Sequence, residues 1–126
     1  MKVKEYLAKL KRVVITCRPE DTVETAATLL VTNQIGAMPV RDANGRIVGM
    51  LSEREIMRGL SQQGKQVERL LVGDLMAKKL ITCAPDDAMV AARTLMKASR
   101  VRHLLVMEDD RLVGLLGLRQ RGFEHA

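Results

Sequence analysis

The 126-residue sequence has almost no aromatic side chains: one tyrosine, one phenylalanine and no tryptophan. Proteins that bind nucleic acid commonly combine a basic stripe with aromatic side chains on which bases stack. The net charge is +6, but five cations and one acid within residues 1–12 account for +4 of it. We therefore interpret this N-terminal segment as solvated or anion-attracting. Nucleic-acid binding through residues 1–12 is the less favoured alternative.

Histidine and cysteine are equally scarce, with His103 and His125 and with Cys17 and Cys83. Two histidines and two dispersed cysteines give no metal-ligand spacing and no disulfide framework. No nucleophile–base pair is visible, and the isolated glycines form no phosphate-binding loop. The sequence therefore predicts no catalytic residue, no metal site and no enzyme.

No apolar run approaches the 18 or more residues of a membrane-spanning helix, so no membrane partner is expected. The N-terminal residues are lysine-rich and lack the apolar region of a secretory signal. With 47% apolar and 29% charged residues, the composition predicts a globular cytoplasmic protein, with room for one compact domain or two very small ones.

The strongest feature is an internal repeat. Shifted by 66 positions, residues 15–30 match residues 81–96 at eight of sixteen positions, and residues 46–51 then resemble 111–116. The polar stretch 62–66 separates the copies, so we divide the chain into repeats 1–66 and 67–126. Cys17 and Cys83 occupy equivalent positions, which favours small buried hydrophobes over reactive thiols.

Each repeat predicts the same series of elements. A short strand (13–17 or 80–83) ends at Pro19 or Pro85, and Asp21 or Asp87 is placed to cap a helix. Strands over 37–40 and 47–51 flank a turn in which Gly45 suits a positive φ. A helix follows Ser52, and short helices are expected at 3–7 and 72–76. The order β-α-β-β-α, twice, predicts an α/β (α+β) fold whose halves share one core about a pseudo-twofold axis.

These residues resemble a tandem pair of CBS domains (the cystathionine β-synthase type), often called a Bateman module. The resemblance rests on 15–21, 35–40 and 49–55 in the first repeat and on 81–87, 102–106 and 112–116 in the second. It covers about residues 3–121, and it is closest to small stand-alone bacterial proteins made of one such pair. It implies a regulatory module that binds adenosine-containing ligands in clefts between the repeats.

In that family, a hydroxyl residue and an acid three positions later hold the ribose hydroxyls, and Ser52 and Glu55 match this pattern. A carboxylate accepts two hydroxyl hydrogens, which suits a ribose. Glu55 stands where the family more often has aspartate. Ser-x-x-Glu before a helix is also a capping box, which needs no ligand, and the two roles are compatible.

The resemblance implies that residues of the opposite repeat close this cleft. Arg102, Arg54 or His103 would face phosphates, since a guanidinium fork matches phosphate oxygens. Neither Arg54 nor His103 needs a ligand to explain it: Arg54 can be a solvated helix residue, and His103 can be a half-buried, hydrogen-bonded residue at the start of a strand. The remaining residues implied at this cleft are Thr82, Cys83 and Pro85.

The second repeat departs from the pattern, because Gly117 replaces the hydroxyl residue and Gln120 replaces the acid. The related cleft lacks a carboxylate, so we expect a weak or empty second site. Its residues are Thr16, Cys17, Ala37, Met38, Pro39 and Gln120.

Two functions follow from these patterns. The first is a non-catalytic sensor of an adenosine-containing ligand (AMP or ATP foremost, S-adenosylmethionine or NADH as others), with no resident cofactor. The alternative is a ligand-free module for protein interaction or dimerisation. The resemblance further implies a homodimer, and regulation would require an effector protein.

Overall fold

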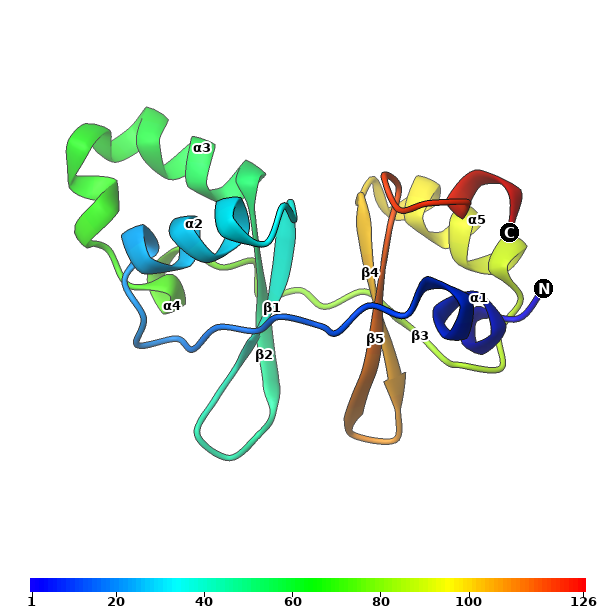
Figure 1. The fold of residues 1–126 in the computed structure, drawn as a ribbon. Coiled ribbons are helices and arrows are strands. Elements are labelled where there is room, and N and C mark those ends of the chain that lie inside the picture. Colours follow the sequence, from blue (N-terminus) through cyan, green and yellow to red (C-terminus); the bar gives the residue numbers. More distant parts are fainter. The chain divides into compact units, whose positions relative to one another are not determined.

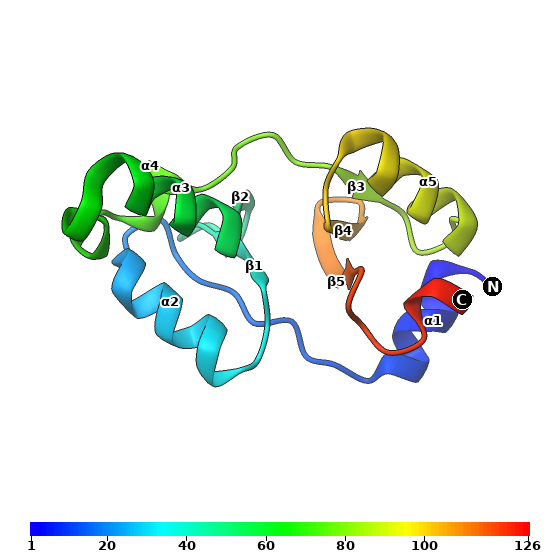
Figure 2. The ribbon, with the colours of Figure 1, turned by 90° about the horizontal axis from the view of Figure 1, so that it is seen from above.

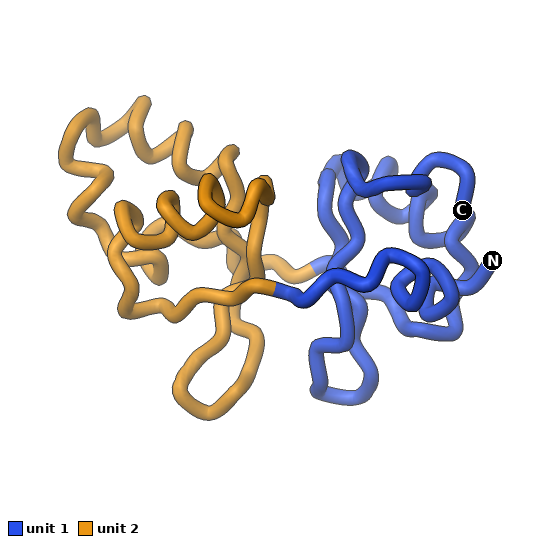
Figure 3. The backbone as a smooth tube through the Cα atoms, in the orientation of Figure 1, with its two compact units in different colours: residues 1–14, 81–126 blue, residues 15–80 orange.

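The computed structural model describes all 126 residues, and the chain divides into two compact units (Figure 3). Unit 1 combines Met1–Val14 with Ile81–Ala126, and unit 2 is Ile15–Leu80. These units differ from the sequence repeats 1–66 and 67–126, because the opening segment of each repeat packs with the other repeat.

Unit 2 is a β-hairpin covered by helices. Strands β1 (Ala37–Arg41) and β2 (Ile47–Ser52) pair antiparallel, and Figures 1 and 2 show the helices on one side of them. Cys17 forms a parallel bridge with Val40 beside the hairpin. The other elements are α2 (Val23–Thr32), α3 (Glu53–Gln63), a 3-10 helix (Gly64–Arg69) and α4 (Val72–Leu75).

Unit 1 repeats this plan around a three-stranded sheet in the order β3-β4-β5 (Figure 1). Strand β3 runs parallel to β4, and β4 pairs antiparallel with β5. The elements are α1 (Val3–Leu10), β3 (Thr82–Cys83), α5 (Met89–Ser99), β4 (His103–Glu108), β5 (Arg111–Gly117) and a 3-10 helix (Phe123–His125).

The α/β class and the two strand hairpins expected from the sequence are confirmed. Two expected elements are not formed: of residues 13–17 only Cys17 makes a bridge, and turns with a short 3-10 helix follow β5 where the repeat predicted a helix. Gly45 adopts φ +83° in the hairpin turn, and a helix begins directly after Ser52. The helix caps differ from the expectation: α2 is capped by Thr22, and Ala88 precedes α5. Aspartates one residue earlier instead close the preceding turn, where Asp21 accepts the Arg18 N–H at 2.9 Å.

The opening helices dock through equivalent backbone hydrogen bonds. In unit 1, the Val3 N–H donates to the Asp87 carbonyl at 2.8 Å. In unit 2, the Val72 N–H donates to the Asp21 carbonyl, also at 2.8 Å. Because residues 21 and 87 are repeat equivalents, each opening helix binds the same turn, but in the half of the chain to which it does not belong by sequence.

A glycine on a strand receives each opening helix. A Cβ added at Gly114 would lie 2.5 Å from Leu7 Cδ1, and one at Gly49 would lie 2.5 Å from Met76 Sδ. Only a hydrogen at these two strand positions lets the side chain of the opening segment lie flat on the sheet.

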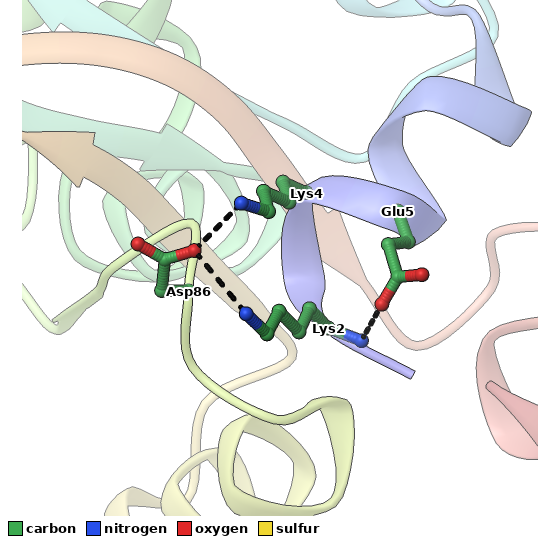
Figure 4. A network of polar contacts seen from close by, with 4 residues as sticks. All are labelled: Lys2, Lys4, Glu5 and Asp86. Atoms are coloured by element: carbon green, nitrogen blue, oxygen red, sulfur yellow. Dashed lines mark hydrogen bonds and ion pairs between the residues drawn. The ribbon is translucent and has the colours of Figure 1, made fainter.

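Exposed charges add to the docking of α1. Lys4 Nζ lies 2.8 Å from Asp86 Oδ1, and Lys2 Nζ lies 3.7 Å from the same atom (Figure 4). The pKa of the Asp86 carboxyl is lowered, mainly by its hydrogen bond with Lys4. Pairs as exposed as these contribute little to stability, so buried Val3 and Tyr6 hold α1 in place. None of the helices in the structure combines the length and the apolar character that a membrane span requires.

Candidate functional site

The hydroxyl–carboxylate pair expected from the sequence forms a compact motif in unit 2. Ser52 ends β2 and caps α3. Glu55 Oε1 accepts the Ser52 N–H at 2.8 Å and also accepts a short hydrogen bond from Ser52 Oγ. Both side chains are half-buried, and neighbouring Arg54 is exposed. Ser52 and Glu55 therefore do cap α3. The Ser52 N–H and the Ser52 hydroxyl both donate to the same carboxylate oxygen, Oε1 of Glu55.

The strand register brings the second predicted set next to this motif. Ala37 pairs directly with Ser52, and the Gly36 carbonyl accepts the Glu53 N–H at 3.0 Å. Two other members of the set, Met38 and Cys17, are buried in the core of unit 2. The Cys17 backbone is engaged as well, since its N–H donates to the Pro39 carbonyl and its carbonyl accepts the Arg41 N–H.

The two cysteines are structural. Burial raises the pKa of Cys17 to about 12 and that of Cys83 to about 11, and the nearby carboxylates of Asp21 and Asp87 add to the effect. Both thiols therefore stay protonated at neutral pH, which makes them poor nucleophiles. The Pro39 carbonyl accepts the Cys17 N–H at 3.1 Å and fixes this segment beside β1.

Unit 1 carries the residues predicted to close the first cleft. Thr82 and Arg102 are exposed, whereas Cys83 is buried. Pro85 is half-buried, and its carbonyl accepts the Lys4 N–H at 2.9 Å. His103 is half-buried at the start of β4, where it pairs with Gly117.

The equivalent residues of the second repeat make the same side-chain contact but close a turn, because no α-helix follows Gly117. Gln120 Oε1 accepts the Gly117 N–H at 2.9 Å, as Glu55 does for Ser52, and Gln120 Nε2 donates to the Leu115 carbonyl at 2.8 Å. The space beside Gly117 is filled, since a Cβ there would lie 3.1 Å from His103 Cδ2. Both polar ends of Gln120 are thus engaged within unit 1.

The sequence patterns did not predict Tyr6 as a neighbour of Gln120. The Tyr6 hydroxyl lies 3.5 Å from Gln120 Oε1 and donates to the Arg121 carbonyl at 3.0 Å. Tyr6 is 114 positions from Gln120 in the sequence, so no local pattern links them. Only the docking of α1 on the second repeat brings them together.

The predicted clefts take residues from both units. Ser52, Arg54 and Glu55 belong to unit 2, and Thr82, Cys83, Pro85, Arg102 and His103 belong to unit 1. In the second set, only Gln120 belongs to unit 1. The composition of both clefts stays a prediction. No group of three or more histidine, cysteine, aspartate or glutamate side chains in the structure could hold a metal ion.

The duplicated plan, a strand hairpin packed with helices in each unit, defines the class of protein as a tandem α/β repeat module. A family model described as "CBS domain" matches residues 3–62 and 72–120. The chain therefore belongs to the CBS-domain family, with one domain in each repeat.

Curated relatives share this pair and extend beyond it. The chain is 30% identical over 106 residues to the mitochondrial CBS domain-containing protein CBSX3 of Arabidopsis thaliana, covering 81% of this chain and 52% of that protein. It is 33% identical over 107 residues to inosine-5'-monophosphate dehydrogenase of Methanocaldococcus jannaschii, covering 84% of this chain and 20% of the enzyme. The chain thus spans about half the length of the first relative and a fifth of the second.

Solved structures share the fold over nearly the whole chain. The CBS-domain containing protein ATU1752 from Agrobacterium tumefaciens matches with a TM-score of 0.89 and 30% identity, over 93% of this chain and 87% of that one. The protein PAE2072 from Pyrobaculum aerophilum, complexed with AMP, matches with a TM-score of 0.84 and 24% identity, over 98% and 95%. The CBS pair of MJ0100, complexed with 5'-methylthioadenosine and S-adenosyl-L-methionine, gives 0.81 and 24%, over 93% and 89%.

Proposed function

We propose that this chain is a non-catalytic regulatory module that binds an adenosine-containing ligand, with AMP or ATP foremost, through Ser52 and Glu55. The observation that carries the proposal is the use of the Glu55 carboxylate. Its two intramolecular hydrogen bonds fall on Oε1, which leaves Oε2 to accept from a ribose hydroxyl. Membership of the CBS family and the adenosine compounds in the complexes of PAE2072 and MJ0100 support the ligand class.

The remaining residues of the proposed site supply backbone and charge. Exposed Thr82 and the backbone of buried Cys83 would border the adenine, together with Pro85. Arg102, Arg54 and the imidazole of His103 would meet phosphate oxygens, since a guanidinium fork matches phosphate oxygens.

The second site would bind weakly. Gln120 is neutral, and its oxygen and nitrogen are already hydrogen-bonded within unit 1. A ribose there would have to break these bonds for a contact that carries no charge. We therefore expect the residues Thr16, Cys17, Ala37, Met38, Pro39 and Gln120 to form a site that stays empty when the first is filled.

Isothermal titration calorimetry with AMP, ATP, S-adenosylmethionine and NADH tests the ligand class. We expect saturable heat with at least one of them, at a stoichiometry near one per chain. The free energy of unfolding should rise by about 2.7 kcal/mol at a ligand concentration 100 times the dissociation constant. No heat and no thermal stabilisation with any of the four would end the proposal.

A module for protein interaction is the second candidate, and exposed apolar side chains favour it. On the helices of unit 2, Val31, Met57 and Leu60 are 79%, 69% and 53% exposed. Exposed methionine and aliphatic side chains suit adaptable contacts between proteins. We propose that these helices mediate a homodimer, and that an effector protein in the cytoplasm reads the liganded state.

Light scattering combined with size-exclusion chromatography tests the homodimer. We expect twice the chain mass at micromolar concentration, and a shift toward the monomer in the variant Met57→Glu, because a buried unpaired carboxylate opposes association. The variant Glu108→Gln, at an exposed position at the end of β4 in unit 1, should keep the dimer. A monomer at high micromolar concentration would contradict the proposal.

A further inference from the structure

Unit 1 contains a cavity that none of the residues proposed for the adenosyl site lines. Its volume is about 460 Å³, within the range of small-molecule sites, and it lies among residues of α1 and of the segment 121–126. All of its lining residues belong to unit 1, so its shape is set within one compact body.

The inner wall of this cavity is apolar and well anchored. Tyr6 is buried and Leu10 is half-buried, and the Tyr6 ring meets Phe123 edge to face at a centroid distance of 6.0 Å. Arg93 Nη1 donates to the carbonyls of Phe123 and Ala126, which ties the segment 123–126 to α5. The wall is therefore preorganised for an apolar body rather than formed by loose chain ends.

Among the side chains of the remaining lining, all charge is positive. Lys9, Arg12 and Arg121 line the cavity with exposed side chains, His125 is a fourth nitrogen-bearing group, and no acidic side chain lines it. Three cations on one small concave surface raise the local positive potential and attract an anion. Two of these cations, Lys9 and Arg12, belong to the basic segment 1–12, for which the sequence predicted no specific partner.

We propose that this cavity is a binding site for an amphiphilic organic anion, separate from both predicted adenosyl clefts. Such a ligand has a compact aromatic or acyl body that ends in a phosphate or carboxylate. The body packs against Tyr6 and Leu10, and the anionic end lies among Lys9, Arg12 and Arg121. Arginine suits this end because its guanidinium fork holds two oxygens of a phosphate or carboxylate. The cavity borders Gln120 of the second repeat, since the hydroxyl of Tyr6, a lining residue, lies 3.5 Å from Gln120 Oε1.

The test is a titration of 1-naphthyl phosphate followed by amide NMR of the whole chain. We expect saturable shifts at Tyr6, Leu10 and Gly122, with Gly122 also lining the cavity. Neutral 1-naphthol lacks the anionic group, and inorganic phosphate lacks the aromatic ring. Each of them alone should therefore bind at least tenfold more weakly than 1-naphthyl phosphate. Affinity should also fall as salt is raised.

Two variants with the same charge change distinguish the cavity from a general basic surface. Arg121→Gln should weaken binding roughly tenfold through loss of a charge-assisted contact. Arg119→Gln removes an exposed arginine two positions away that does not line the cavity, and it should leave the affinity within twofold. Equal losses in both variants would overturn the proposal.

The adenosyl site is tested separately in the same assay. Glu55→Gln should leave the affinity for 1-naphthyl phosphate unchanged, because Glu55 belongs to unit 2. No saturable shifts, equal binding of 1-naphthol, or shifts confined to residues 52–55 would each overturn the cavity proposal. None of these results would bear on calorimetry with adenosine compounds.

Discussion

Glu55→Gln should weaken the adenosyl ligand roughly 30-fold, because a hydrogen bond to a charged acceptor is worth about 1.5–3 kcal/mol. At a ligand concentration 100 times the wild-type dissociation constant, the stabilisation should fall from about 2.7 to about 0.9 kcal/mol. Calorimetry gives the affinity, and thermal denaturation with and without ligand gives the stabilisation. The ligand is whichever of the four compounds binds the wild-type chain.

The second repeat offers a precedent for this substitution, in a turn and not at a helix start. Gln120 Oε1 accepts the Gly117 N–H at 2.9 Å, and Glu55 Oε1 accepts the Ser52 N–H at 2.8 Å. Glutamine can therefore accept the same backbone N–H, so we expect the start of α3 to survive in Glu55→Gln. The loss of binding then reports the charge rather than unfolding.

Glu53→Gln is the matched control. Glu53 lies in the same first turn of α3 and is exposed, and it takes no part in the cap. Its removal changes the charge of the chain by the same amount, so the affinity should stay within about twofold, as for exposed charges. Equal losses in the two variants would assign the effect to the general electrostatic field of α3 and not to a ribose contact at Glu55.

Much of each repeat could be predicted because its signals are local. The apolar runs that became β1 and β2, the turn with Gly45 and the Ser52–Glu55 spacing all act within a few residues. The shift of the helix cap from Asp21 to Thr22 shows the limit. An aspartate can close a turn or cap a helix, and only the backbone decides which.

The exchange of the opening helices could not be predicted from such patterns. Residues 3–7 and 72–76 resemble each other, which predicts two equivalent helices but not the half on which each docks. Each docked segment lies against a strand glycine, where an added Cβ would lie 2.5 Å from Met76 Sδ at Gly49 and 2.5 Å from Leu7 Cδ1 at Gly114. A glycine in a strand predicts close approach of something, but the sequence does not identify the partner. Tyr6 near Gln120 is a consequence of the same exchange.

The largest effect on stability should come from Phe123→Ala. Phe123 is 1% exposed and belongs to the core of unit 1 with Tyr6, Met89 and Leu116. Removing a buried phenylalanine side chain leaves a cavity and costs about 3–4 kcal/mol. We expect a lower free energy of unfolding in urea and a melting temperature lower by roughly 10 °C.

Hydrogen exchange should place this loss in unit 1, with α1 and α5 losing protection first, because Phe123 packs on Tyr6 of α1 and its carbonyl accepts from Arg93 of α5. Phe123→Leu retains most of the volume and should cost about 1 kcal/mol. Met57→Ala removes a 69% exposed side chain and should change the stability of the chain by less than about 0.5 kcal/mol. A cost below 1 kcal/mol for Phe123→Ala would mean that the segment 121–126 does not form part of the core. The wall of the cavity beside Tyr6 would then be unsupported, which makes this variant an independent check on the binding site proposed in that cavity.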